Sequence, residues 1–189
     1  MTTRRETIKR EAARLFAVHG YGGASLRDIA AASGVRQPTL YDHFPSKAAL
    51  LLEVVHGYFD VLVPCLRATP AEGSAATRLA TMLRESVEVS TTHRDVFLTT
   101  SNNWELIRTD PALSPLVARR DEATAAWRAV LRDGVHDGSL RRMHVPTALA
   151  IIASAVAGLV DCRYVEPGDG GALDVDTLVT VVVEGMAPR

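Results

Sequence analysis

The chain has 189 residues and a mass of 20.4 kDa, with 47% hydrophobic and 23% charged residues. This composition is typical of a globular protein of one large or two small domains, and it excludes a disordered chain. Two cysteines, Cys65 and Cys162, are too few for a disulfide framework, and they form no CxxC motif for metal or redox chemistry.

We expect neither a secretion signal nor a membrane partner. The N-terminal stretch MTTRRETIKREAARLF has basic residues but no apolar core of signal-peptide length. The segment 144–160 lacks Asp, Glu, Lys and Arg over 17 residues. It contains Pro, Thr and Ser, however, and it is shorter than the roughly 20 apolar residues of a membrane helix. A buried helix is the expectation there.

The net charge of −1 conceals an uneven distribution. Residues 1–50 hold eight Lys or Arg residues against four Asp or Glu residues, whereas residues 51–189 hold 13 against 18. This pattern favours contact between the N-terminal segment alone and a polyanion. Chance fluctuation over 50 residues is the alternative that charge leaves open.

Helical spacing of apolar residues predicts a first helix that ends at Gly20, followed by a turn at Tyr21. A short second helix is expected next, because Ser25 is a suitable N-cap with Asp28 three residues later, an acidic variant of the capping box. Ser33-Gly34 ends this second helix. The residues expected on the two inner faces are Ile8, Ala12, Leu15, Phe16 and His19, then Leu26, Ile29 and Ala30.

Prolines delimit the third and fourth predicted helices. Pro38 fits the first turn of a helix, where its missing N–H is not needed, and Pro45 ends that helix. Ser46 caps a longer fourth helix, which extends to Pro64. The expected inner residues are Leu40 and Phe44 in the third helix, and Leu50, Leu51, Val54, Tyr58 and Leu62 in the fourth.

Helical periodicity continues to the end of the chain. A change of composition at residues 67–76 (RATPAEGSAA) marks a connection and a domain boundary. Beyond it we expect helices near residues 75–92, 94–108, 114–136, 146–164 and 174–186. Because no segment shows the alternation of a strand, the prediction is an all-α fold.

Two short helices joined by a Gly-containing turn, with longer helices before and after, form the layout of a helix-turn-helix. From Ser25 to Lys47 the chain reads SLRDIAAASGVRQPTLYDHFPSK. From about Thr7 to Leu52 it closely resembles the N-terminal domain of the TetR family of bacterial transcriptional regulators, above all in the QPTLYxH core. Two residues depart from the family pattern: Arg36 stands where a small capping Ser is common, and Asp42 adds a negative charge. We expect Asp42 to face solvent or a neighbouring side chain, with acceptance of a hydrogen bond from cytosine N4 as the alternative.

The resemblance implies a cytoplasmic bacterial regulator, a repressor rather than an activator, that binds a palindromic operator as a dimer and is released by a small-molecule ligand. We assign residues 1–48 to a three-helix helix-turn-helix DNA-binding domain. The long fourth helix joins it to a helical ligand-binding and dimerisation domain, residues 49–189. Repression is expected because a dimer on its operator blocks polymerase sterically, and no activation surface is visible in the sequence.

The start of the third helix is expected to contact bases in the major groove. Arg36 can fork onto guanine O6 and N7, Gln37 onto adenine N6 and N7, and the Thr39 methyl group can touch the thymine methyl group. Pro38 presents an apolar ring there, and Arg27 is a further candidate for contacting bases. Solvated surface charge is the alternative for both arginines.

Four other residues are expected to contact phosphates. Tyr41 and His43 can donate hydrogen bonds, with core packing and solvent exposure as their respective alternatives. Ser25 and Lys47 each lie at a helix start, where free backbone N–H groups favour an anion. Since a cation is unfavourable at a helix N-terminus, a phosphate near Lys47 would resolve that conflict.

The last two predicted helices have the composition of a homodimer interface. The segment 147–159 (TALAIIASAVAGL) permits close helix–helix approach. The final helix has an apolar sector too wide for a peripheral helix, formed by Val175, Leu178, Val179, Val182, Val183 and Met186. Pairing both helices with their symmetry mates would form a four-helix interface, and a role as ordinary core helices is the alternative.

Aromatic residues with polar neighbours are the candidates for an effector site, because pockets combine an apolar lining with a few polar anchors. The predicted contacts are Phe97, Asn103, Trp104, Trp127 and Tyr164. Core packing is the alternative for each. The nearby polar residues are His93, Asn102, Asp161 and Arg163.

Two rival classes of protein are considered. One is an enzyme, and the other is a small-molecule-binding or structural helical bundle without a DNA-binding role. The chain has no GxSxG, Walker A, GxGxxG or HExxH motif. Its six histidines show no spacing suited to a metal. A bundle explains the helices but not the basic QPTLY segment. We therefore expect no enzymatic activity, no cofactor and no metal.

Overall fold

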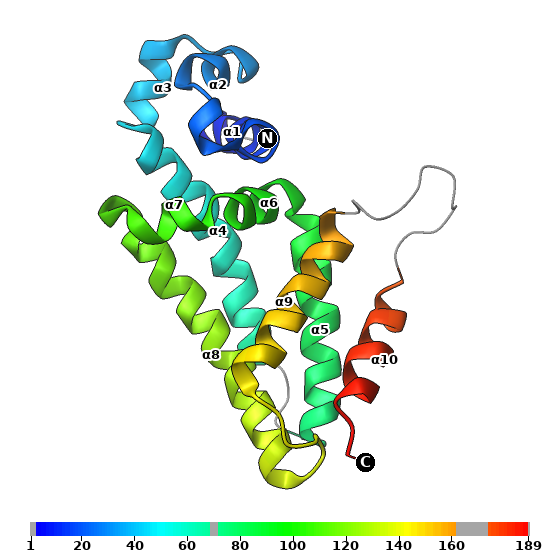
Figure 1. Ribbon diagram of the computed structural model, residues 1–189. Helices are drawn as coiled ribbons and strands as arrows, with labels where there is room; N and C mark the ends of the chain where they lie inside the picture. Colours follow the sequence, from blue (N-terminus) through cyan, green and yellow to red (C-terminus); the bar gives the residue numbers. More distant parts are fainter. Residues whose placement is uncertain (1–2, 69–71, 162–173, 189) are drawn as a thin grey trace. The chain divides into compact units, whose positions relative to one another are not determined.

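The computed structural model describes residues 3–68, 72–161 and 174–188, and these ranges contain helices and no strand. The predicted all-α fold is therefore confirmed. The chain divides into two compact units, Met1–Asp60 with His93–Arg120 and Val61–Thr92 with Asp121–Arg189. Figure 1 shows their helices. The two units do not coincide with the DNA-binding and ligand-binding domains expected at residues 1–48 and 49–189. Those domains are defined by function, and they stay a prediction.

The first four helices are α1 (Arg4–Gly23), α2 (Leu26–Ala32), α3 (Gln37–His43) and α4 (Lys47–Ala68). The predicted N-caps are found at the starts of α2 and α4. The Ser25 hydroxyl accepts a hydrogen bond from the backbone N–H of Asp28 at the start of α2 (3.1 Å). Ser46 accepts one from the N–H of Ala49 at the start of α4 (3.0 Å). Pro38 lies in the first turn of α3, as expected.

α1 is kinked at Gly20, where the first helix was expected to end. Gly20 has φ 70° and ψ 163°, a conformation open to glycine but strained for other residues. The kink brings the ring of Tyr21 to 5.6 Å from that of Phe16, centroid to centroid. Tyr21 thus completes the apolar face of α1. The prediction that His19 belongs to this face was wrong, because His19 is exposed.

Apolar side chains from all four N-terminal helices form the core of the first unit. Its fully buried residues include Ile8, Ala12, Phe16, Ile29, Leu40, Phe44, Leu50 and Leu51. α6 (Arg94–Asn102) packs along α1. The buried Thr99 hydroxyl donates a hydrogen bond to the carbonyl oxygen of Ala13 between these helices (3.1 Å). Residues far apart in sequence are therefore joined in one unit.

The helix predicted over residues 94–108 is two helices, α6 and α7 (Trp104–Thr109), followed by the short 3-10 helix η1 (Pro111–Leu113) and by α8 (Ser114–Asp137). The break lies at Asn103, which has φ −115° and ψ 17°. The Asn103 side chain donates to the carbonyl oxygen of Thr99 (2.7 Å). The backbone N–H of Asn103 donates to the same carbonyl oxygen (3.2 Å), so Asn103 caps the end of α6 through both groups.

α4 continues past Pro64, so the predicted end at this proline was wrong. A proline inside a helix costs about 3 kcal/mol or more, because it removes one backbone hydrogen bond and crowds the preceding turn. Pro64 itself is exposed, whereas Val63 and Leu66 beside it are buried, and their burial offsets that loss. By length and composition alone α4 could cross a membrane, yet half of its most apolar stretch is buried within the protein.

The second unit is formed by the end of α4, α5 (Ala75–Thr92), the later part of α8, α9 (Val145–Asp161) and α10 (Val175–Gly185). α5 packs against both α9 and α10 (Figure 1). The start of α5 is joined to the end of α8 by an ion pair between Arg78 and Asp133 (2.9 Å). The helices expected at 75–92, 114–136 and 174–186 are confirmed within one or two residues. Residues 162–164 of the helix expected at 146–164 lie outside the described residues.

Replacement of glycine by alanine should have opposite effects on stability at two helical positions, Gly134 and Gly57. A Cβ at Gly134 would lie 2.5 Å from the Leu140 side chain and 3.1 Å from Cβ of Ala75, whereas one at Gly57 would meet nothing within 4 Å. Gly134→Ala should therefore lower the free energy of unfolding by about 1–3 kcal/mol through overpacking. Gly57→Ala should raise it by up to about 1 kcal/mol through helix propensity. Urea unfolding at one protomer concentration checks both. Equal stability of the two variants would contradict the close packing at Gly134.

Candidate DNA interface

The outward side of α3 carries side chains that the protein leaves available. Arg36, Gln37, Pro38 and Tyr41 are exposed, Tyr41 to 46%, and Thr39 is half-buried. Within the described part of the chain, the Arg36 and Gln37 side chains make no hydrogen bond or ion pair. The opposite side of α3 is buried through Leu40 and Phe44, which belong to the core of the first unit. The expected base-contacting residues therefore share one free surface.

The start of α2 presents Ser25 and Arg27. Arg27 is exposed, and no hydrogen bond or ion pair engages it among the described residues. The Ser25 hydroxyl donates to a carboxylate oxygen of Asp28 (2.5 Å) while accepting from the N–H of the same residue. A phosphate at Ser25 would compete with that carboxylate for the hydroxyl proton. The predicted phosphate contact of Ser25 thus has a local competitor, whereas that of Arg27 with a base has none.

Lys47, the first residue of α4, lies against an aromatic ring. Its Nζ is 4.5 Å from the ring centroid of Tyr21. Partial burial lowers the pKa of Lys47. The pKa of Tyr21 is raised, mainly by burial and to a smaller extent by the negative charge of Asp110. The electron-rich face of a neutral tyrosine attracts a cation, which eases the position of Lys47 at a helix N-terminus. The sequence pattern predicts only a turn at Tyr21 and gives no sign of this contact with Lys47.

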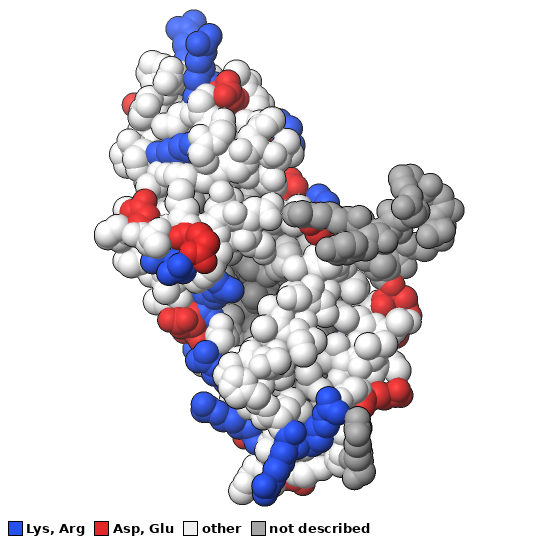
Figure 2. Space-filling model, viewed as in Figure 1, with Lys and Arg blue, Asp and Glu red and all other residues white. Residues whose placement is uncertain are grey.

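Ion pairs engage most of the basic residues of α1. The pairs are Arg5–Glu53, Lys9–Glu6, Arg10–Glu11 and Arg14–Glu11. Among the described residues of the basic segment, Arg4, Arg27, Arg36 and Lys47 are in no ion pair, and their positive charge is available to a polyanion. Figure 2 shows basic side chains projecting at the end of the first unit that carries α2 and α3. His43, at the end of α3, is half-buried.

The aromatic effector candidates are divided between the two units. The half-buried Phe97 packs edge-on against Tyr58, with ring centroids 6.3 Å apart. Trp104 lies under the guanidinium of Arg120, 3.8 Å from Cζ to the ring centroid. Both belong to the first unit, whereas Trp127, which is 9% exposed, belongs to the second. Tyr164 lies outside the described residues. An effector site at these residues stays a prediction.

The amide of Asn103 is engaged within the protein. Its Oδ1 accepts a hydrogen bond from the backbone N–H of Tyr21 (2.9 Å). Its Nδ2 donates to the carbonyl oxygen of Thr99, as described for the helix break. Asn103 therefore ties α6 to the chain just after the Gly20 kink. Its predicted ligand contact stays untested, and this bridge is a role that sequence reasoning missed, because the partners are 82 residues apart.

A three-helix arrangement whose two-turn third helix exposes Arg36, Gln37 and Tyr41 defines a helix-turn-helix DNA-binding protein. The comparisons with known proteins agree. A model of the bacterial regulatory proteins of the tetR family matches residues 8–54, and a model of the Tetracyclin repressor-like C-terminal domain matches residues 72–161. The chain belongs to the TetR family of bacterial transcriptional regulators and is a DNA-binding regulator of transcription.

Relatives match over the whole chain. The HTH-type transcriptional repressor KstR2 of Rhodococcus jostii is 30% identical over 190 residues, which cover 97% of this chain and 91% of that protein. Two solved structures share the fold. They are the ketosteroid transcriptional regulator KstR2 of Mycobacterium tuberculosis (TM-score 0.85, 24% identity, 100% and 97% coverage) and the TetR family regulator PfmR of Thermus thermophilus (TM-score 0.81, 25% identity, both chains covered to 100%).

Removal of the Asn103 amide should destabilise the first unit. In Asn103→Ala the part-buried N–H of Tyr21 loses its acceptor, and we expect the free energy of unfolding to fall by about 1–3 kcal/mol. The exposed neighbour Asn102 provides the control, since Asn102→Ala should change stability by less than about 0.5 kcal/mol. Urea unfolding followed by circular dichroism measures both. An Asn103→Ala protein as stable as the control would show that the bridge contributes nothing.

Proposed function

We propose that the protein is a repressor that binds a palindromic operator as a homodimer and is released by a small-molecule effector. The observation that carries the proposal is the exposed side of α3, where Arg36 and Gln37 are available for base contacts. The name of the R. jostii relative, a transcriptional repressor matched over 97% of this chain, supports repression. A dimer on its operator blocks polymerase sterically.

Exposed apolar residues on α9 and α10 support dimerisation through these helices. Ile151 is 55% exposed and Val181 is 66% exposed, although both are large aliphatic side chains. The buried sides of the same helices are formed by Ala148, Ile152, Val156 and Val160 on α9, and by Val179 and Val182 on α10. A second protomer would remove the exposed residues from water. A two-fold symmetric dimer matches a palindrome with half-sites about one helical turn apart.

Release by an effector requires a difference in affinity between two forms of the dimer. The effector must bind the form whose recognition helices are wrongly spaced for successive grooves more tightly than the competent form. Coupling of about 1–3 kcal/mol per site is usual, and two symmetric sites add. Trp104 and Trp127 allow a fluorescence screen for ligands. A tight ligand that leaves operator affinity unchanged would contradict release while leaving DNA binding intact.

We further propose that the protein acts in the bacterial cytoplasm and has no enzymatic activity. Family membership supports both, because the relatives named above are regulators of transcription. Among the described residues, no group of three or more His, Cys, Asp or Glu is placed to hold a metal ion. A turnover screen run beside an electrophoretic shift with the chain's own upstream DNA separates the classes. Turnover without a shift would favour an enzyme.

Two substitutions separate base contacts from phosphate contacts. Lys47→Ala should weaken binding to all duplexes and reduce the slope of log Kd against log salt by about one per protomer, or about two for the dimer, because each protomer loses one phosphate contact. Gln37→Ala should cost about 1–3 kcal/mol at particular base pairs. Titrations with operator duplexes that carry single base-pair changes measure both effects.

The control for Lys47→Ala is Arg132→Ala, which removes the same charge from an exposed position on the second unit. Figure 2 shows that basic side chains also gather at the lower end of this unit, on α8 and beyond. We expect Arg132→Ala to leave operator affinity unchanged. If both variants lost affinity equally, net charge and not a contact at Lys47 would be responsible. If Gln37→Ala kept every base preference, its assignment would be wrong.

A charge on the proposed dimer face should separate the protomers. We expect Ile151→Glu and Val181→Glu to yield a 20.4 kDa species at micromolar concentration, where the wild type elutes as a dimer. Burying an unpaired carboxylate in an interface is unfavourable. Val18→Glu is the control, because Val18 is 67% exposed on α1 of the other unit. Size exclusion with light scattering measures the mass. A monomeric wild type, or dimeric variants, would contradict this interface.

A further inference from the structure

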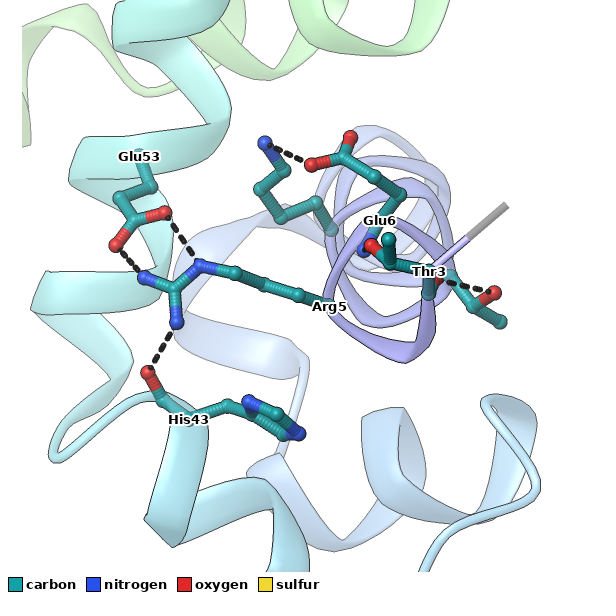
Figure 3. Close-up of polar contacts among 7 residues, drawn as sticks. Thr3, Arg5, Glu6, His43 and Glu53 are labelled. Atoms are coloured by element: carbon teal, nitrogen blue, oxygen red, sulfur yellow. Dashed lines mark hydrogen bonds and ion pairs between the residues drawn. The ribbon is translucent and has the colours of Figure 1, made fainter. Parts of the chain in front are cut away.

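One arginine of α1 joins the two helices on either side of the turn after α3. The Arg5 guanidinium donates to both carboxylate oxygens of Glu53 on α4, with an Nε···Oε2 distance of 3.2 Å. Its Nη1 donates to the backbone carbonyl oxygen of His43, the last residue of α3 (3.0 Å). Its Cζ lies 4.5 Å from the centroid of the Phe44 ring. Figure 3 shows this fork between the two helices.

The C-terminal end of α3 needs such a partner. The last carbonyl groups of a helix have no donor within the helix, and a cation there is favourable. α3 has seven residues, too few to be stable alone, so its orientation depends on neighbouring elements. Arg5 supplies a donor to its final residue and anchors that donor through Glu53. One side chain therefore fixes α3 relative to both α1 and α4.

The Arg5 guanidinium is engaged by groups of the protein, although its side chain is 40% exposed. Two of its nitrogens face a carboxylate and the third faces a carbonyl oxygen, while the ring of Phe44 lies against the guanidinium. The carboxylate of Glu53 neutralises the positive charge locally. These contacts leave Arg5 poorly suited to act as a phosphate contact, although it belongs to the basic N-terminal segment.

We propose that Arg5 and Glu53 are positioning residues for operator binding, which hold α3 in the orientation that α3 needs in the major groove. The proposal rests on the proposed DNA-binding function. It has one distinctive consequence, which is that an acidic residue, Glu53, strengthens binding to a polyanion. Long-range electrostatics alone predicts the opposite, because removal of a negative charge close to the DNA-binding helices should tighten binding.

Glu53→Gln and Arg5→Lys test the proposal in the full-length dimer, with the operator duplex mapped in the upstream DNA and a scrambled duplex of equal length. Glutamine offers Arg5 one neutral acceptor in place of a bidentate carboxylate. Lysine keeps the charge but has neither the planar fork nor the flat face that lies over Phe44. Both variants should weaken operator binding by about tenfold or more, as expected for the loss of charge-assisted hydrogen bonds. Binding to the scrambled duplex should change less.

Glu6→Gln is the matched control. Glu6 is an exposed residue of α1 that pairs with Lys9 (2.8 Å), and its substitution makes the same change of charge as Glu53→Gln. We expect the control to bind the operator as tightly as the wild type or more tightly. Thermal unfolding of each variant defines an assay temperature at which all are folded. If Glu53→Gln has no such temperature, Arg5→Lys decides alone.

The ratio of operator affinity to scrambled-duplex affinity separates positioning from loss of structure, because a partly unfolded protein loses both. A reduced ratio in Glu53→Gln and Arg5→Lys, with an unchanged ratio in Glu6→Gln, supports the proposal. An operator affinity of Glu53→Gln or Arg5→Lys equal to or above that of the wild type overturns it. If the wild type itself binds no duplex, the proposed function fails, and that outcome is distinct from either result.

Discussion

The recognition helix α3 has seven residues, and its orientation depends entirely on what packs behind it. Leu40 and Phe44 are fully buried on its inner side, and Pro38 restricts its first turn. Arg36 occupies the N-cap position without a side-chain capping bond, which makes α3 still more dependent on its neighbours. The gain is functional: since stability comes from one side, the side chains on the other side are available for DNA.

Contacts behind α3 extend through the rest of the first unit. Lys47 follows α3 and rests on the ring of Tyr21, and the backbone of Tyr21 is held by Asn103. The carbonyl oxygen of Thr99 accepts a hydrogen bond from the Asn103 side chain, and the Thr99 hydroxyl donates one to the carbonyl oxygen of Ala13 on α1. A short series of polar contacts thus connects α6 to the residue expected to meet phosphate. This connection explains why residues 93–120 form one unit with the N-terminal helices.

Features encoded by neighbouring residues could be predicted from the sequence. The Ser25 cap depends on a residue three positions away, and the bounds of α5 follow from apolar spacing. The exposed residues of α3 could be assigned because one motif contains the whole helix. Features set by distant partners could not be predicted. Arg5 and Glu53 are 48 residues apart, and the continuation of α4 past Pro64 depends on burial that no local pattern contains. The effector site belongs to this second kind, since its lining depends on tertiary packing.

In the proposed complex, two copies of α3 bind successive major grooves of one duplex. Selection of bound duplexes from a random-sequence library by the wild-type protein, followed by sequencing, tests it most directly. We expect enrichment of an inverted repeat whose half-site centres lie about 10 base pairs apart, or a multiple of that spacing. Enrichment of a single motif without an inverted partner, or no enrichment at any salt concentration that permits binding, would contradict it.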